Sequence, residues 1–274
     1  MFSTFMWDAW ISGTAVATVA GLVGFFVVLR GSAFAAHTIP NGAFAGAAGA
    51  GFLGLNPLWG TVSVSLVSAW LIGSLSRRSR RDVVTALTLV LMLAVGSAFL
   101  ALTTSYAIAV QSLLFGEILG VTSAQLVPVI AVVLGCAVML GAIFRPLLYQ
   151  SITPELAQVR GVHKVRIDIL FLLLVALVTA ITVPIVGALL TFSLMIGPPA
   201  AARLWTNRPM RAMGLSVLFS VVTMWLALAS SYQSNWPIGF FVGTLAASSY
   251  LSSRLVVPLL RRRSRTIAVD LDVI

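Results

Sequence analysis

The residues best suited to chemistry in this sequence lie in one apolar stretch near its beginning. His37 is the only histidine inside an apolar run, and Asn41 follows it four residues later, so the two share a face if the stretch is helical. A polar side chain at membrane depth is costly and is therefore a candidate functional residue. Glycines and alanines after Asn41 allow neighbouring helices to approach closely. This pattern predicts a helix beside a translocation path, with His37 and Asn41 facing the path; a packed structural histidine is the alternative.

The composition is that of an integral membrane protein. Of the 274 residues, 59% are hydrophobic and 9% are charged, and the mean hydropathy is +1.06, whereas soluble domains carry about 25% charged residues. The net charge of +10 does not indicate nucleic-acid binding, because membrane proteins gather arginine and lysine in cytoplasmic loops. The single cysteine, Cys136, excludes an intramolecular disulfide and a thiolate-rich metal site, and we expect it to be packed.

The sequence predicts an all-α polytopic bundle of about nine transmembrane helices. At about 20 residues per span, the length leaves no room for a separate soluble domain. We expect one transmembrane domain over residues 1–263, with a cytoplasmic tail at 264–274, and no cleaved signal peptide. The spans are expected at 8–29, 33–55, 57–75, 83–103, 124–149, 167–183, 186–204, 212–230 and 236–260.

Basic residues alternate between successive connections. Arginine or lysine follows the first, third, fifth, seventh and ninth predicted spans, and the other connections carry neither. Because cytoplasmic loops are the basic ones, the N-terminus is expected outside and the C-terminus in the cytoplasm. One span more or fewer would break the alternation, which therefore supports nine.

The longest hydrophilic connection, residues 150–166, carries the signals of a short cytoplasmic helix. Ser151 or Thr153 can cap it, Pro154 suits its first position and Glu155 its first turn. Such a helix either lies in the interface or docks a cytoplasmic partner. Docking is favoured because the sequence holds no phosphate-binding loop of the pattern G-x-x-x-x-G-K-[ST]. A transporter that contains this chain therefore depends on ATP hydrolysis by another subunit or on an ion gradient.

The seventh predicted span carries backbone breaks. Pro184 and Gly187 predict a tight outer turn before it, and Gly197, Pro198 and Pro199 lie late within it. Two consecutive prolines remove two backbone donors and predict a kink. Irregular helices at membrane depth occur where they are buried in protein or line a watery path, so the segment is either a path element or a plain kink.

Residues 105–122 are apolar but too interrupted to span, and we expect them to be re-entrant or interfacial on the outer side. Glu117 is an acid in apolar surroundings there. It is either a gating or metal-attracting carboxylate or an interfacial residue at a helix end.

Four motifs in order resemble those of one transporter family. They are H-x-x-P-x-G in the second span, L-L-F-G-x-I-L on the outer side, P-E-L-A-x-x-R-G in the cytoplasmic loop, and V-P-I-V-G-A-L-L-x-x-x-L-M-I-G-P-P-A-A-A-R-L in the late segment. Along nearly its whole length the chain resembles the membrane permease of the bacterial zinc, manganese and iron uptake ABC importers.

This resemblance implies a multi-pass permease of the bacterial plasma membrane, with no catalytic residue and no tightly bound cofactor. The permease would work as a dimer, with itself or a sister chain, among membrane lipid. Two cytoplasmic ATPase subunits would hydrolyse ATP, and an extracytoplasmic solute-binding protein would deliver zinc or manganese as the substrate.

The resemblance also implies roles for individual residues. His37 would bind metal transiently. From the residues themselves we also expect Asn41, Glu117 and Ser193 along the path and a kink at Gly197, Pro198 and Pro199. The family's coupling helix, which transmits ATP-driven motion, corresponds here to Pro154, Glu155, Ala157 and Gly161.

The sequence departs from the family pattern at two acidic positions. Ala33 stands where the family commonly has Asp four residues before the histidine, and Asn235 stands where it often has Asp near the last outer loop. Without these carboxylates, an ABC importer of the same architecture could instead transport a chelated metal or a small organic solute. A proton-coupled secondary transporter is a further alternative, although it would normally need acids or histidine pairs within the spans.

Overall fold

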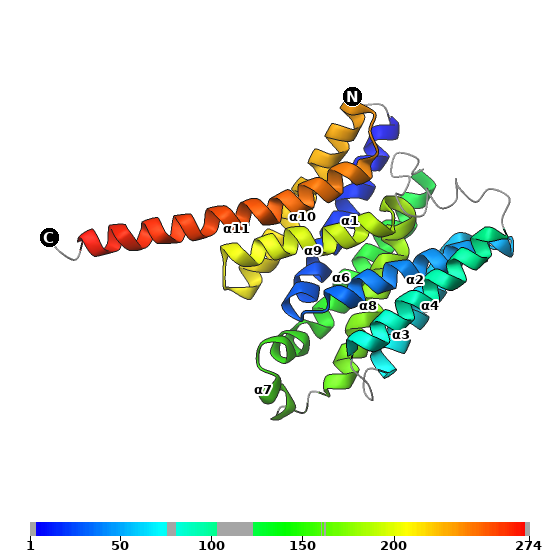
Figure 1. Cartoon of the computed structure of the whole chain (residues 1–274), viewed down its shortest axis with the longest axis horizontal. Helices are drawn as coiled ribbons and strands as arrows, with labels where there is room; N and C mark the ends of the chain where they lie inside the picture. The colour runs from blue at the N-terminus through cyan, green and yellow to red at the C-terminus, as the bar shows by residue number, and fades with distance from the viewer. Residues whose placement is uncertain (1–3, 76–80, 103–122, 160, 162, 272–274) are drawn as a thin grey trace.

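The computed structural model describes residues 4–75, 81–102, 123–159, 161 and 163–271, and all regular secondary structure in them is helical (Figure 1). This confirms the predicted all-α class. The helices are α1 (Thr4–Leu29), α2 (Ala33–Phe52), α3 (Pro57–Leu75), α4 (Arg81–Ala101), α6 (Ser123–Ile152), α7 (Pro154–Val159), α8 (Lys164–Val186), α9 (Ala188–Trp205), α10 (Pro209–Ser234) and α11 (Ile238–Leu271).

Among the described residues, 7 helices are long and apolar enough to cross a membrane: α1, α3, α4, α6, α8, α10 and α11. Each coincides with a predicted span. The predicted second and seventh spans coincide with α2 and α9. These helices are less apolar because α2 contains His37 and Asn41 and α9 contains Arg203. That all nine cross the membrane, and in which orientation, stays a prediction.

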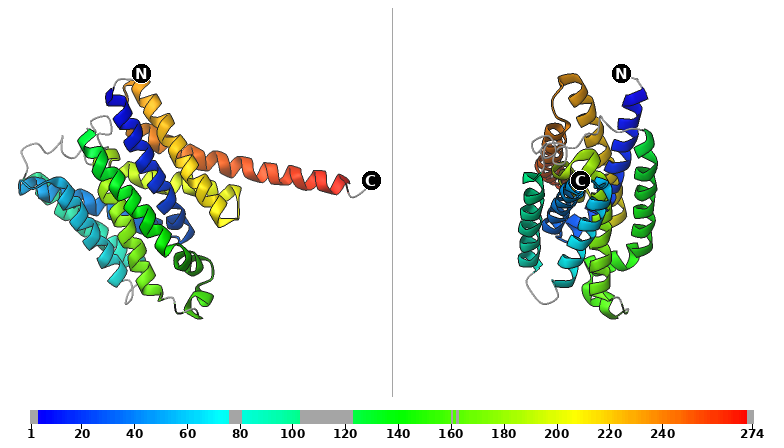
Figure 2. Two further views of the ribbon diagram at one scale, coloured as in Figure 1. Left: turned by 180° about the vertical axis from the view of Figure 1, so that it is seen from behind. Right: turned by 90° about the vertical axis from the view of Figure 1, so that its right-hand side faces the viewer.

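The helices form two groups that α8 joins (Figure 1, Figure 2). In one group α2 packs against α3 and α4. In the other, α1 packs against α9 and α10, and α11 packs against the same two helices. Helix α8 contacts α2, α3, α6 and α9, while the far part of α11 extends away from the bundle toward the C-terminus. The interface between the groups is therefore where α2 meets α8 and α9.

The core lies where α1, α6, α8 and α9 meet. Its largest fully buried side chains include Phe25, Phe26, Leu147, Phe171 and Met195. Phe26 makes edge-on ring contacts with both Phe25 and Phe144, at centroid distances of 5.1 and 5.6 Å, an arrangement that aromatic pairs prefer. Cys136 belongs to the same core at 2% exposure, which confirms that it is packed.

Helix α2 lies unusually close to α3. Gly46 and Gly60 face each other so that a Cβ on either would collide with the carbonyl oxygen of the other. A Cβ at Gly42 would likewise meet the side chain of Ser68. These contacts fix α2, and with it His37 and Asn41, against α3.

Several helix ends differ from the predicted ones by a few residues, and two of these differences change a prediction. Helix α8 continues past Pro184 to Val186, so the turn into α9 is made by Gly187 alone, with φ of 91°. Glycine adopts such a positive φ without a steric penalty, which explains why it suffices. Helix α11 continues beyond residue 260 to Leu271, so the predicted tail is helical over most of its length.

Candidate functional site

The first candidate site is the part of α2 that carries His37 and Asn41. Both side chains are half-buried and lie one turn apart on one face, as the spacing predicts. The Asn41 Nδ2 donates a hydrogen bond of 2.7 Å to the carbonyl oxygen of His37. This bond fixes the amide and leaves its Oδ1 as the atom suited to a cation, since oxygen donors are what metals take from amides.

The His37 ring lies against α9. It contacts Phe192 edge-on, with ring centroids 4.7 Å apart and an interplanar angle of 67°. Ser193, a half-buried residue, directly follows Phe192. The structure therefore places His37 of α2 against α9, in contact with the residue that precedes Ser193 in the sequence, at the interface between the two helix groups. Glu117 lies outside the described residues.

Helix α9 is unbroken through Gly197, Pro198 and Pro199, so the prolines do not interrupt it. Pro199 has no N–H to donate to the Met195 carbonyl, the acceptor four residues before it. That carbonyl instead lies against Gly24 of α1, where a Cβ would come within 2.5 Å of the oxygen. Proline in α9 and glycine in α1 thus allow a close crossing of these helices.

The predicted cytoplasmic helix is present as α7. It begins at Pro154, carries an exposed Glu155 in its first turn, and is followed by Gly161 with φ of 73°. Thr153 directly precedes α7, and its carbonyl accepts from the Ala157 N–H at 3.2 Å, so it lies at the predicted N-cap position. Ser151 lies inside α6, where its hydroxyl donates to the Leu147 carbonyl, and the Thr153 hydroxyl donates to the Tyr149 carbonyl at 3.4 Å.

Ala157 anchors the inner face of α7. Its side chain is 1% exposed, and α7 packs against the preceding helix α6. The four residues assigned to coupling therefore divide into an exposed acid, a buried alanine and two backbone-shaping residues.

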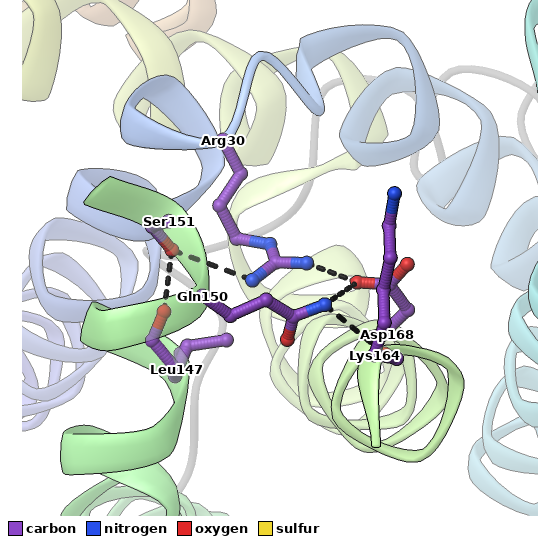
Figure 3. Close-up of polar contacts among 6 residues, drawn as sticks. All are labelled: Arg30, Leu147, Gln150, Ser151, Lys164 and Asp168. Carbon is purple, nitrogen blue, oxygen red and sulfur yellow. Dashed lines mark hydrogen bonds and ion pairs between the residues drawn. The ribbon is translucent and has the colours of Figure 1, made fainter. Parts of the chain in front are cut away.

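A buried polar cluster lies beside α7 (Figure 3). Arg30, in the turn between α1 and α2, forms an ion pair with Asp168 near the start of α8. The Arg30 Nη1 also donates to the Ser151 Oγ at 3.4 Å. The Gln150 Nε2 donates to the Asp168 Oδ1 at 3.2 Å and to the Lys164 carbonyl oxygen at 3.1 Å. One arginine thus joins the α1–α2 turn to the end of α6 and the start of α8.

Within the described residues, no group of three or more His, Cys, Asp and Glu side chains could hold a metal ion. A resident metal centre needs such a set. On α2 the donors available to an ion are the imidazole of His37 and the amide of Asn41.

The two positions that lack the family's acids have structural surroundings of their own. Ala33 is the first residue of α2. Asn235 ends α10 in the left-handed conformation, with φ of 55°, and its N–H donates to the Ser231 carbonyl. Asparagine tolerates this conformation better than most residues, so Asn235 has a conformational role whatever the cargo.

The sequence model of the ABC 3 transport family matches residues 2–257. The chain belongs to this family. It is therefore a multi-pass permease subunit of the plasma membrane, and ATP hydrolysis belongs to a separate subunit.

Similar proteins align with most of the chain. The manganese import system permease protein ScaB of Streptococcus parasanguinis is 29% identical over 266 residues, 96% of this chain and 95% of the relative. The high-affinity zinc uptake system membrane protein ZnuB of Haemophilus influenzae is 27% identical over 224 residues, 80% of this chain and 85% of the relative. The solved structure of PsaBC from Streptococcus pneumoniae in complex with Fab has a TM-score of 0.84 at 28% identity and covers 94% of each chain.

Sequence reasoning about this ABC 3 permease missed Arg30, Gln150 and Asp168 as a group. Arg30 was informative only as a topology marker between two spans. The available signal was the acid at residue 168 inside an otherwise apolar segment, because an acid near a helix start that is shielded from water needs a partner.

Proposed function

We propose that this permease forms the translocation path of an ABC importer for a divalent metal ion, manganese or zinc. The observation that carries the proposal is that relatives named as manganese and zinc permeases align with 80% to 96% of the chain. The metal is the substrate here and not a resident cofactor.

In this proposal the ion passes between α2 and α9. His37 offers a neutral imidazole nitrogen and Asn41 an amide oxygen, both ligands of divalent transition metals. Two neutral donors bind such an ion weakly, and weak binding favours its release. Ser193 on α9, beyond the contact between His37 and Phe192, and Glu117 on the outer side would complete the path.

The remaining architecture follows the family. Two copies of the permease, or this chain and a sister chain, would pair in the membrane, with two ATPases on the cytoplasmic side and a solute-binding protein outside. Helix α7 would dock onto the ATPase through Pro154, Glu155, Ala157 and Gly161. This arrangement requires the N-terminus outside and the C-terminus in the cytoplasm, as the distribution of basic residues predicts.

A second cargo class is favoured by a specific observation. The chain has Ala33 and Asn235 at the positions where two carboxylates are common in the family. A chelated metal or a small organic solute would not need those carboxylates, because its charge is already neutralised by the chelator or is absent.

The deciding experiment is ATP hydrolysis by the purified complex of permease, ATPase and binding protein, titrated with manganese and with zinc. We expect one metal to stimulate hydrolysis, and His37→Ala to abolish most of that stimulation. The matched control is His163→Ala, which removes the other histidine; its side chain is exposed, and its Nδ1 lies 3.1 Å from the Gly161 carbonyl oxygen. This variant should respond to metal like the wild type.

Each outcome assigns the function differently. Stimulation that survives His37→Ala would keep the metal importer and remove His37 from the path. No response to either ion, together with a response to a chelated metal, would replace the free ion by the second cargo class.

A further inference from the structure

The ion pair between Arg30 and Asp168 is largely buried, in a protein in which only 9% of the residues are charged. The two side chains are 7% and 16% exposed. Arg30 also lies over the Phe171 ring, 5.2 Å from its centroid. Burying two charges is expensive, and two well-packed apolar residues would often serve stability as well or better. The pair therefore calls for an explanation other than stability.

The cluster encloses both ends of α7. Gln150 and Ser151 precede the helix at the end of α6, and Lys164 and Asp168 follow it at the start of α8. Figure 3 shows the Arg30 guanidinium between these two sides, bonded to Ser151 on one and to Asp168 on the other. A displacement of α7 that moves α6 relative to α8 must stretch or rearrange these bonds.

Arg30 also connects the cluster to the path helix. It ends α1 in a tight turn in which Ser32 N–H donates to the Val27 carbonyl at 2.9 Å and Gly31 N–H to the Val28 carbonyl at 3.3 Å. This is the hydrogen-bond pattern of a Schellman motif, which fixes the direction of the following chain. Helix α2 starts at Ala33, and His37 lies only one turn further on.

The cluster has the means to adopt a second arrangement. Among the described residues the Gln150 Oε1 is a buried acceptor without a hydrogen-bond partner. The Gln150 amide shares the Asp168 Oδ1 with the Arg30 guanidinium, which carries five donors. Next to the cluster is a cavity of ≈ 390 Å³, lined in part by Leu29, Ser151 and Arg203. A spare acceptor and adjoining space let the guanidinium exchange partners while it stays hydrogen-bonded.

We propose that Arg30, held between Asp168 and Ser151, is a positioning residue that transmits the movement of α7 to the path helix α2. Coupling between sites requires an element with two discrete arrangements that both sites bias. Here docking of the ATPase would bias the separation of α6 and α8, and the Arg30 turn would convey that change to α2. This proposal rests on the proposed function only in assuming that an ATPase docks onto α7. It does not depend on which cargo is transported.

The test compares transport with ATP hydrolysis in proteoliposomes that contain the whole complex. The main variant carries Arg30→Gln together with Asp168→Asn, because removing both charges leaves neither one buried alone. A second variant, Arg30→Lys, keeps the charge but loses the planar fork that reaches two partners at once. The control is Asp82→Asn, which removes an exposed acid in the first turn of α4.

We expect both cluster variants to hydrolyse ATP within about twofold of the wild type and to move about tenfold less metal per ATP, a typical size for coupling between sites. The control should keep the wild-type ratio. A purely structural cluster would lower transport and hydrolysis in parallel, and an unchanged ratio in Arg30→Lys would overturn the proposal even if the double variant failed to assemble.

A second readout needs no cargo. In the Cys136→Ser background, which removes the only cysteine, Asn41→Cys is labelled with a thiol reagent with and without ATP. ATP should change the labelling rate when the cluster is intact and have no effect in Arg30→Lys. If the wild type transports neither manganese nor zinc, the cargo assignment fails, but the labelling experiment still tests the coupling proposal. A labelling rate that ATP does not change when the cluster is intact would refute the coupling proposal.

Discussion

Replacing Gly46 by alanine should separate α2 from α3. The added Cβ would overlap the Gly60 carbonyl, lying 2.6 Å from its carbon atom and 2.9 Å from the Val64 Cβ. Ordinary contacts begin near 3.4 Å. The Gly60 atoms belong to the backbone, and the Val64 Cβ is bonded directly to it. No side-chain rotation therefore relieves the overlap, and the helices must move apart by roughly 1 Å at this crossing.

The magnitude follows from two opposing effects. Overpacking of this kind costs about 1–3 kcal/mol, and a rigid backbone neighbour places Gly46→Ala at the upper end. Alanine regains up to about 1 kcal/mol through its higher helix propensity. The net loss is therefore about 2 kcal/mol, which for a chain of this length lowers the Tm by roughly 4–8 °C.

The assay is thermal unfolding of the purified permease in detergent, with Gly51→Ala as the matched control. Gly51 lies in the same helix, is exposed, and has nothing within 4 Å of its would-be Cβ. Alanine there keeps the propensity gain without the collision, so the Tm should stay constant or rise slightly.

Gly46→Ala should thus lower the Tm and Gly51→Ala should not, although the two variants make the same chemical change in one helix. If Gly46→Ala unfolds at the wild-type temperature or above it, α2 and α3 are not held together by this glycine contact. The reasoning that this contact fixes the position of His37 and Asn41 would then be wrong.

Two more substitutions test other parts of the chain. Glu155→Ala should change the free energy of unfolding by no more than about 0.5 kcal/mol, as is usual at exposed sites, while it lowers the ATP hydrolysis of the assembled complex; unchanged hydrolysis would remove Glu155 from the docking surface. Gly187→Ala should destabilise by about 1–3 kcal/mol, because its φ of 91° strains any residue with a Cβ, and a thermal scan that shows no loss would contradict that account.

The sequence was sufficient for the elements whose signals are local. Apolar length, basic connections and the signals at Pro154 and Glu155 placed the long helices and α7 close to where they lie. Of the two predicted cap residues, Thr153 lies at the start of α7 and Ser151 does not, because α6 continues to Ile152 and the Ser151 hydroxyl donates to the Leu147 carbonyl. A one-turn difference in where a helix ends is below what propensity can resolve.

The parts that could not be predicted depend on contacts between distant segments. Arg30 and Asp168 are 138 positions apart, and nothing in the pattern near either residue names the other. The same holds for His37 and Phe192, which meet only because α2 and α9 cross. Local pattern predicts which residues are polar at depth, and only the packing of helices decides which of them meet.

Helix α2 is held at two points, and the proposed path residues lie between them. At its start the turn containing Arg30 is tied to α6 and α8, and further along Gly46 is pressed against Gly60 of α3. A change of partners at Arg30 therefore cannot move α2 alone, because α3 must follow through the glycine contact. Such a movement would carry α2 and α3 together relative to α9, and it would open or close the contact between His37 and Phe192 where we place the passing ion.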